Sequence, residues 1–217
     1  MIGTEFETQT GTYTITCLLG KGKSGHTYLM ERPTPHGMEE RVLKIMHGET
    51  VPFYSHQRDR VTAEVDAYRA LRPHGIRMPE LLEYDVERRY LVKSYVDGRT
   101  AAALVADGLL DDAILGQLFE MAARLESAGI NIDYFPTNFV VTPAGELYYI
   151  DYESNPYSDA WNLANWGIYY WVNQQGMRRF LQTGDAAYIN QDVDSGIPIK
   201  KGLEAEVERL YAAFAVP

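Results

Sequence analysis

The sequence predicts an α+β protein in which a β-rich N-terminal third is followed by a mainly helical remainder. Short runs that alternate apolar and polar residues, separated by turns rich in Gly and Pro, dominate the first hundred positions. Later segments space their apolar residues at helical intervals. A length of 217 residues accommodates one large domain or two small lobes with a real core.

Composition excludes some classes of function. Apolar residues make up 46% and charged residues 23% of the chain, which is ordinary for a globular protein. The formal net charge of −10 argues against a nucleic-acid-binding protein, because phosphate contacts need a basic face. No run approaches about 18 apolar residues, so we expect no membrane-spanning helix and no membrane partner.

The single cysteine, Cys17, excludes an internal disulfide and fits a reducing cytosol. We therefore expect a cytoplasmic protein and interpret Cys17 as a buried strand residue. The N-terminal segment lacks the basic and apolar regions of a signal peptide. The five histidines show no close metal-ligand spacing, so we expect no structural zinc.

The N-terminal region predicts about five antiparallel strands and one helix, ending near Asp97 and Gly98. Alternate residues from Tyr13 to Leu19 share one face of the first strand. The segment Arg32 to Gly37 contains two prolines and a glycine, so we expect a loop there. The expected strands are Tyr13–Leu19, His26–Met30, Arg41–Met46, Glu80–Tyr84 and Tyr90–Val96.

The remainder predicts helices around one hairpin. Asp111 or Asp112 can cap a helix that ends near Gly129. Proline and glycine in the segment 142–145 fit a type I turn between the hairpin strands 138–142 and 146–151. Two further helices are expected at Trp161–Trp171 and Leu203–Phe214. The first is rich in aromatic residues, so we interpret it as a buried helix, with a partner surface as the alternative. Residues 184–217 show no motif.

A glycine-rich segment, Gly20-Lys21-Gly22-Lys23-Ser24-Gly25, follows the first strand. The next residues read as a strand, which argues against a dinucleotide-binding turn and favours a flap over nucleotide phosphates, since a backbone without Cβ atoms can approach the anion. Lys21 and Lys23 would add positive charge there. A plain hairpin turn is the alternative.

Lys44 stands within an apolar strand, where an unpaired charge is costly. Either the strand lies at an edge and Lys44 faces water, or Lys44 is buried with a carboxylate and contacts phosphates. Glu64 supplies that carboxylate, because it shares the apolar stripe of the helix predicted over Gln57–Leu71. The alternative for Glu64 is a solvated helix residue.

The segment around Asp133 and Asn138 is the most specific pattern. Asp133 and Asn138 are five residues apart, and the predicted hairpin brings Asn138 beside Asp151 at its other end. Oxygen ligands of this kind suit Mg²⁺, which takes few protein ligands and keeps water and phosphate oxygens. Turn and cap hydrogen bonds are the alternative.

These elements, in this order, resemble the protein-kinase-like superfamily over roughly residues 13–171. The resemblance implies a two-lobe fold: residues 1–97 form a nucleotide-binding sheet lobe, and residues 98–217 form a truncated, mainly helical lobe. It also implies the cofactors ATP and Mg²⁺ and a hydroxyl acceptor on a protein or a small molecule. The implied site comprises the phosphate loop Gly20, Gly22, Ser24 and Gly25; the catalytic residues Asp133, Lys44 and Glu64; the adenine contacts Ser94 and Val96; and the metal ligands Asn138 and Asp151.

Several positions depart from the protein-kinase pattern. Ile132 stands where protein kinases have an arginine, and Phe135 stands where they often have a lysine. Lys93 occupies the gatekeeper position beside adenine. The run Asp151-Tyr152-Glu153 is similar to aminoglycoside and choline kinases, although the chain is shorter than those enzymes.

We therefore expect an active Mg-ATP phosphotransferase of a pared-down bacterial type. A pseudokinase that binds nucleotide or a partner without turnover is the alternative, motivated by Phe135, Ile132 and Lys93. The sequence leaves open the acceptor, the regulator and the oligomeric state.

Overall fold

A computed structural model describes residues 1–22, 24–47, 59–192 and 196–214. The chain divides into two compact units: Met1–Arg69 with Pro79–Tyr95, and Ala70–Met78 with Val96–Pro217. The functional boundary expected between residues 97 and 98 stays a prediction. The start of the helix predicted from Gln57, and Lys23 of the glycine-rich segment, lie outside the described residues.

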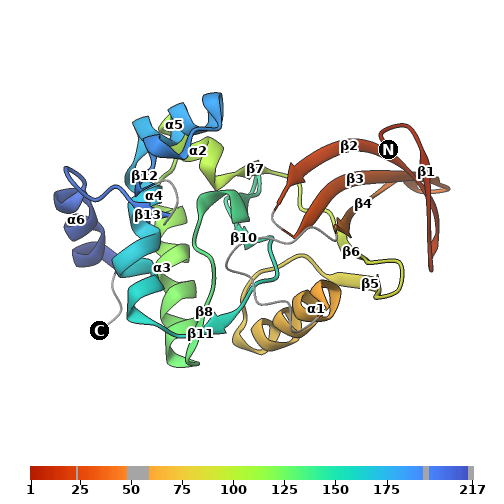
Figure 1. Ribbon diagram of the computed structural model, residues 1–217, viewed down its shortest axis with the longest axis horizontal. Coiled ribbons are helices and arrows are strands. Elements are labelled where there is room, and N and C mark those ends of the chain that lie inside the picture. Colours follow the sequence, from red (N-terminus) through yellow and green to blue (C-terminus); the bar gives the residue numbers. More distant parts are fainter. Residues whose placement is uncertain (23, 48–58, 193–195, 215–217) are drawn as a thin grey trace. The chain divides into compact units, whose positions relative to one another are not determined.

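The first unit is a curled antiparallel sheet of six strands with one helix, α1 (Figure 1). The strand order is β1-β2-β3-β4-β6-β5. Asp59 caps α1, because its Oδ1 accepts a hydrogen bond from Thr62 N at 3.1 Å. The elements are β1 (Glu5–Thr8), β2 (Gly11–Lys21), β3 (Gly25–Thr34), β4 (Gly37–Met46), α1 (Arg60–Leu71), β5 (Leu81–Asp85) and β6 (Tyr90–Ser94).

The prediction of about five strands was one too low, because the expected strands began at Tyr13 and did not include β1. Its short Glu-Phe-Glu-Thr sequence offers little apolar alternation, yet all four residues pair with β2. The loop predicted over 32–37 was also wrong, since β3 and β4 continue to a tight turn with Thr34 opposite Gly37. The Thr34 hydroxyl closes that turn by donating to Gly37 O at 2.8 Å.

Cys17 is exposed, which corrects the expectation of a buried strand residue. The pairing of β2 with β3 shifts register between Ile15 and Cys17, as at a β-bulge. A bulge adds one residue and turns the following side chains to the other face. Tyr13 and Ile15 are therefore buried, while Leu18 and not Cys17 packs against the same core.

The sheet has a core on each face. Inside the curl lies one cluster: Tyr13, Ile15, Tyr28, Met30, Leu43, Tyr90 and Val92. The opposite face packs on α1 through Met46, Val61, Val65 and Leu91. Lys44 alternates with Leu43 along β4 and so belongs to the α1 face.

Glu83 of β5 joins the two edges of this curled sheet. Its Oε1 accepts hydrogen bonds from Gln9 N and from the Tyr90 hydroxyl, each at 3.0 Å. Its Oε2 accepts from Thr10 Oγ1 at 3.2 Å. Because Gln9 and Thr10 form the turn between β1 and β2, this buried carboxylate ties the first edge of the sheet to the last.

The second unit is mainly helical, with short strand pairs. Asp111 caps α3, because its Oδ1 accepts a hydrogen bond from Ile114 N at 2.9 Å. The sequence predicted a cap at Asp111 or Asp112, and the structure selects Asp111. The strands and α-helices of the second unit are β7 (Arg99–Thr100), α2 (Ala101–Asp107), α3 (Asp112–Ser127), β8 (Ile130–Asn131), β9 (Phe139–Val141), β10 (Leu147–Tyr149), β11 (Asn155–Pro156), α4 (Ile168–Val172), α5 (Gln174–Thr183), β12 (Asn190–Asp192), β13 (Ile197–Pro198) and α6 (Glu204–Phe214). Short helical turns span Arg72–His74, Pro136–Asn138, Asp159–Trp161, Leu163–Gly167 and Ala186–Tyr188.

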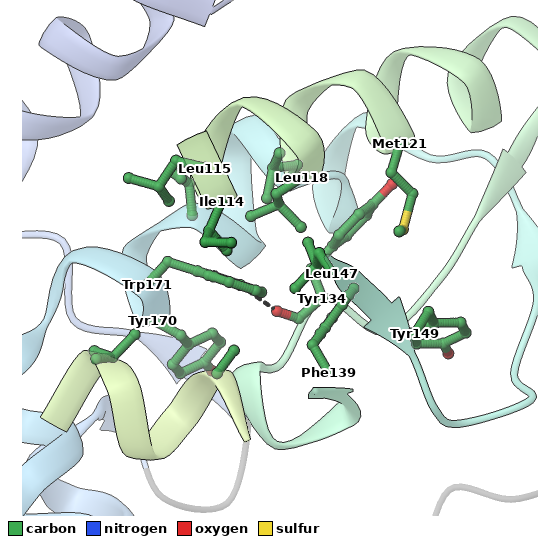
Figure 2. Close-up of a cluster of buried hydrophobic side chains, with 14 of the residues drawn as sticks. Ile114, Leu115, Leu118, Met121, Tyr134, Phe139, Leu147, Tyr149, Tyr170 and Trp171 are labelled. Atoms are coloured by element: carbon green, nitrogen blue, oxygen red, sulfur yellow. Dashed lines mark hydrogen bonds between the residues drawn. The ribbon is translucent and has the colours of Figure 1, made fainter. Parts of the chain in front are cut away.

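One large core holds this unit together. Figure 2 shows side chains of α3 directed toward Phe139 of β9 and Trp171 of α4. The rings of Phe139 and Trp171 meet edge to face, with centroids 5.1 Å apart. Through this core the helices pack around the β9–β10 hairpin. Two predicted site residues flank this hairpin: Asn138 directly precedes β9, and Asp151 follows β10 by two positions.

The helix predicted over 161–171 is broken into three short pieces, and one of its ends is not buried. A 3₁₀ turn, a π-helical turn over Leu163–Gly167 and α4 follow one another. Trp161 is 57% exposed and stacks on Trp166 with ring centroids 4.6 Å apart, whereas Trp171 is buried. Helices α2 and α5 were not predicted. None of the described helices is long and apolar enough to cross a membrane.

Candidate active site

The glycine-rich segment is the turn between β2 and β3. Gly22 N donates to Gly25 O at 2.8 Å, which closes the turn. A Cβ atom on Gly25 would lie 2.3 Å from Ile45 O, so packing against β4 already requires glycine at that position. A Cβ on Gly20 would meet no atom within 4 Å. The fold therefore explains Gly25 but gives no steric reason for Gly20.

Lys44 of β4 and Glu64 of α1 form a buried ion pair within the first unit. Lys44 is 6% exposed and Glu64 is 8% exposed. Strand β4 lies between β3 and β6, so Lys44 is not on an edge strand facing water, and Glu64 is not a solvated helix residue. Two buried charges have lost most of their hydration, which makes each dependent on the other.

Ser24 links the glycine-rich turn to this ion pair. Its hydroxyl donates to Glu64 Oε1 at 3.4 Å, and Lys44 contacts the same oxygen. The turn, β4 and α1 therefore meet at one carboxylate.

The predicted adenine contacts lie at the end of the first unit and the start of the next segment. Ser94 ends β6, and its N–H donates to Glu80 O at 2.9 Å while its Oγ accepts from Glu80 N at 2.8 Å. Val96 begins the long segment of the second unit. Their role toward a nucleotide stays a prediction. Lys93, one residue earlier, is buried and only 4% exposed.

Asp133 stands exposed in a loop whose neighbouring side chains are anchored in the core. Ile132 and Tyr134 are buried on either side of it. The Trp171 indole N–H donates to Tyr134 O at 2.7 Å, drawn as a dashed line in Figure 2. A Cβ on Gly167 would lie 2.4 Å from the Tyr134 Cβ, so the π-helical turn also packs closely against this loop. The sequence analysis did not foresee either support.

Asn138 and Asp133 belong to one closed loop. Asn138 Nδ2 donates to Asp133 O at 3.3 Å, and Asp133 Oδ1 accepts from Phe135 N at 3.0 Å. Asp133 is thus held by its own loop with the carboxylate at the surface. The hydrogen bond to Phe135 N is also the turn chemistry that the sequence analysis kept as an alternative.

The β9–β10 hairpin brings Asn138 beside Asp151. Ile150 N donates to Asn138 O at 2.8 Å, so Asn138 faces the residue just before Asp151. Asp151 is partly buried, and its Oδ1 accepts from Tyr152 N at 3.1 Å. The hairpin pairing therefore brings the backbone at Asn138 next to Asp151, and the convergence of their side-chain oxygens stays a prediction.

Tyr149 lies next to both carboxylates. Burial raises its pKa well above the ordinary tyrosine value, and the charges of Asp151, Asp133 and Glu153 raise the pKa further. Its hydroxyl donates to Glu153 O at 3.2 Å. The sequence offered one indication of this residue: Tyr149 precedes Asp151 by two positions on the predicted strand 146–151, where alternate residues point to the same side.

The oxygen atoms of Asn138 and Asp151 fit a hard divalent cation better than zinc or copper. No group of three or more His, Cys, Asp or Glu side chains that suits a metal ion occurs in the described ranges. A cation held by Asn138 and Asp151 would share its remaining coordination positions with water and phosphate oxygens, which is how Mg²⁺ is usually bound with nucleotides.

Phe135 is part of an aromatic cluster. Its ring meets Tyr170 edge to face at 4.9 Å between centroids, and Phe180 at 5.8 Å. This packing explains why an apolar residue stands two positions after Asp133, and it means that Phe135 adds no positive charge beside that aspartate.

The sequence of this chain matches a family of phosphotransferases. The model of the family described as "Phosphotransferase enzyme family" matches residues 16–136, which include the glycine-rich turn, Lys44, Glu64 and Asp133. Asn138 and Asp151 lie beyond that match. A search of curated proteins found no match.

Among solved structures, the chain is similar to the PknI kinase domain of Mycobacterium tuberculosis, crystallised as a double mutant. The sequences are 21% identical, the TM-score is 0.48, and the match covers 72% of this chain. This chain spans 65% of the length of that kinase domain.

Proposed function

Because this chain belongs to the phosphotransferase enzyme family, and so to the protein-kinase-like superfamily, we propose that it transfers the γ-phosphoryl group of Mg-ATP to a hydroxyl group. The acceptor is the alcohol of a small molecule or a Ser/Thr side chain of a protein. The run Asp151-Tyr152-Glu153 favours the small molecule, by its resemblance to aminoglycoside and choline kinases.

The buried ion pair of Lys44 and Glu64 is the observation that supports this proposal most strongly. A sheet that needed only a stable core would place an apolar residue there, since apolar replacements of buried ion pairs are often neutral or stabilising. Lys44 stands there instead at 6% exposure, paired with Glu64 and beside the turn that contains Ser24. A fixed ammonium group next to a glycine-rich turn suits the α- and β-phosphates of a nucleotide.

The remaining residues take roles that follow from their chemistry. Asp133 orients the acceptor hydroxyl and accepts its proton, since its carboxylate is exposed and held by the loop. Asn138 and Asp151 hold Mg²⁺, which supplies positive charge against the phosphate oxygens when bound. The backbone of the turn around Gly20, Gly22, Ser24 and Gly25 covers the phosphates, and Ser94 and Val96 contact the base.

Thermal unfolding with and without Mg-ATP tests this proposal. Ligand at about 100 times its Kd stabilises a protein by about 2.7 kcal/mol, which for a domain of this size raises Tm by roughly 5–10 °C. We expect a rise that requires Mg²⁺ and disappears in Asp151→Asn. Asp159→Asn is the matched control, because Asp159 is exposed in the same unit and its contact with the Tyr157 hydroxyl survives as an amide.

Turnover of ATP, followed by release of ADP, completes the test. A Mg²⁺-dependent rise in Tm together with turnover that Asp151→Asn abolishes supports the phosphotransferase. Absence of both in the wild-type protein contradicts it.

One observation favours a second candidate, a nucleotide- or partner-binding module without turnover. Phe135 packs into the aromatic cluster at the position from which protein kinases often direct a lysine toward the γ-phosphate. A rise in Tm without turnover, for any hydroxyl acceptor offered, would identify the chain as such a module.

A further inference from the structure

Arg60 occupies the junction of three segments in the first unit. It is the first residue of α1, and its Nη1 donates to Ser24 O at 3.1 Å and to His47 O at 3.0 Å. Ser24 belongs to the glycine-rich turn and His47 directly follows β4. One guanidinium group therefore joins the turn, the end of β4 and the start of the helix that bears Glu64.

The contact lies where the glycine-rich turn leaves the sheet. Gly25 and Met46 form the last pair of β3 and β4. His47 N continues the ladder by donating to Ser24 O at 3.2 Å, and the His47 ring Nε2 lies 3.3 Å from Gly22 O. Arg60 thus binds the carbonyl that ends the regular pairing, which is the point from which a glycine-rich backbone would otherwise move freely.

Helix α1 reaches Ser24 from two successive turns. Arg60 binds the carbonyl oxygen of Ser24, and Glu64, four residues later, accepts from its hydroxyl at 3.4 Å. Residues four apart in a helix lie on the same face. The position of the turn is therefore coupled to the position of the helix, and through Glu64 to Lys44.

Helix stability does not explain an arginine at this place. A cation at the first position of a helix opposes the macrodipole, and the charge that does favour the start of α1 is the carboxylate of its cap, Asp59. The unfavourable charge is retained where it makes two charge-assisted hydrogen bonds to backbone carbonyls of other segments.

We propose that Arg60 is a positioning residue for nucleotide binding: it holds the glycine-rich turn in place relative to the Lys44–Glu64 pair. The inference rests on the proposed function. A turn fixed before the nucleotide arrives loses less conformational entropy on binding. Arg60 therefore acts mainly on the affinity for the nucleotide, while the reacting groups near Asp133 are unchanged.

Three variants test this role: Arg60→Ala, Arg60→Lys and the control Arg69→Ala. Arg69 lies on the same helix, 63% exposed, with an ion pair to Asp66. The first measurement is amide hydrogen exchange of the segment 18–30 in the nucleotide-free protein. We expect faster exchange in Arg60→Ala, an intermediate rate in Arg60→Lys, and no change in Arg69→Ala. Unchanged exchange in Arg60→Ala would overturn the inference.

The second measurement separates positioning from a merely structural role. We expect Arg60→Ala to raise KM for ATP about tenfold, as for the loss of a charged hydrogen bond, with kcat changed less than twofold. Arg60→Lys should recover part of KM, since lysine retains the charge without the planar donor pair. A fall in kcat at unchanged KM would also overturn the inference.

The two proposals fail in different ways. If the wild-type protein neither binds nor turns over Mg-ATP, the proposed function fails, and Arg60 with it loses any role toward a nucleotide. If the wild type turns over Mg-ATP and Arg60→Ala behaves as Arg69→Ala does, only the positioning role is wrong.

Discussion

Lys44 and Glu64 pair across the interface between β4 and α1, and the same Glu64 oxygen also accepts the Ser24 hydroxyl. The pair is therefore at once part of the core on the α1 face and part of the proposed phosphate site. Stability and nucleotide binding depend on it in different ways, so variants can separate the two.

We expect Lys44→Met to destabilise the protein by about 3 to 5 kcal/mol, because Glu64 stays buried without its cation. The double variant Lys44→Met/Glu64→Leu should recover most of that loss, since an apolar pair of similar volume removes both desolvation costs. Urea unfolding measures the stability of each variant.

Nucleotide binding should be lost in both variants, including the double variant that folds well. The loss of stability in the double variant is compared with the sum of the losses in the single variants Lys44→Met and Glu64→Leu. If the two are equal, the pair is not coupled as the structure indicates. If the double variant still binds Mg-ATP, Lys44 is not a phosphate ligand.

Tyr90 makes the stability of the folded protein fall at high pH. Burial, together with the hydrogen bond to Glu83 and the charge of Glu83, raises the pKa of Tyr90 to about 12. The pKa in the folded protein is thus above the unfolded value of about 10, so the neutral phenol is favoured by folding. This stability is present below about pH 10 and is lost as the pH rises from 10 through 12, an effect of about 2 to 3 kcal/mol.

We expect Tyr90→Phe to lose less stability than the wild type between about pH 10 and 12, as measured by urea unfolding at each pH. Other buried tyrosines, such as Tyr149, titrate in both proteins, so the difference between the two curves isolates Tyr90. Parallel curves would show that Tyr90 is not protected from ionisation by burial and Glu83.

The proposed site could be predicted from the sequence where the argument depended on short-range geometry. A hairpin with a recognisable turn places Asn138 beside Asp151, and the Ile150–Asn138 hydrogen bond follows from that pairing. Lys44 could be inferred because a lysine within an apolar strand is costly without a partner.

Other features depend on contacts that a single segment does not reveal. The bulge that turns Cys17 to the surface arises from the pairing of β2 with β3. Strand β1 is fixed by β2 and by the carboxylate of Glu83, far away in sequence. Helix α2 has only seven residues between Thr100 and Gly108, and buried alanines give it little amphipathic pattern. The role of Arg60 could not be predicted because its hydrogen bonds to Ser24 O and His47 O are made to backbone carbonyls, which leave no trace in the sequence.

Two glycines of the turn, Gly20 and Gly25, should respond differently to alanine. Gly25→Ala would place a Cβ 2.3 Å from Ile45 O, a backbone atom that cannot move without disturbing the β3–β4 ladder. We expect a loss of stability of about 1 to 3 kcal/mol, as for other overpacked positions. Gly20→Ala meets no atom within 4 Å, so its stability should stay within about 0.5 kcal/mol of the wild type.

At Gly20, alanine should weaken the affinity for the nucleotide although it leaves the stability of the protein unchanged. If the backbone of the turn approaches phosphate oxygens, the added methyl group at Gly20 occupies space that the phosphates need, and Kd for Mg-ATP should rise although the fold is intact. Gly37→Ala is unsuitable as a control, because its positive φ of 128° strains any other residue. Gly116→Ala is suitable, since it lies within α3 and its nearest new contact is the Phe214 ring at 3.6 Å. Equal affinity for Mg-ATP in Gly20→Ala, Gly116→Ala and the wild type would mean that the turn does not cover the phosphates, and the glycines would then serve the hairpin alone.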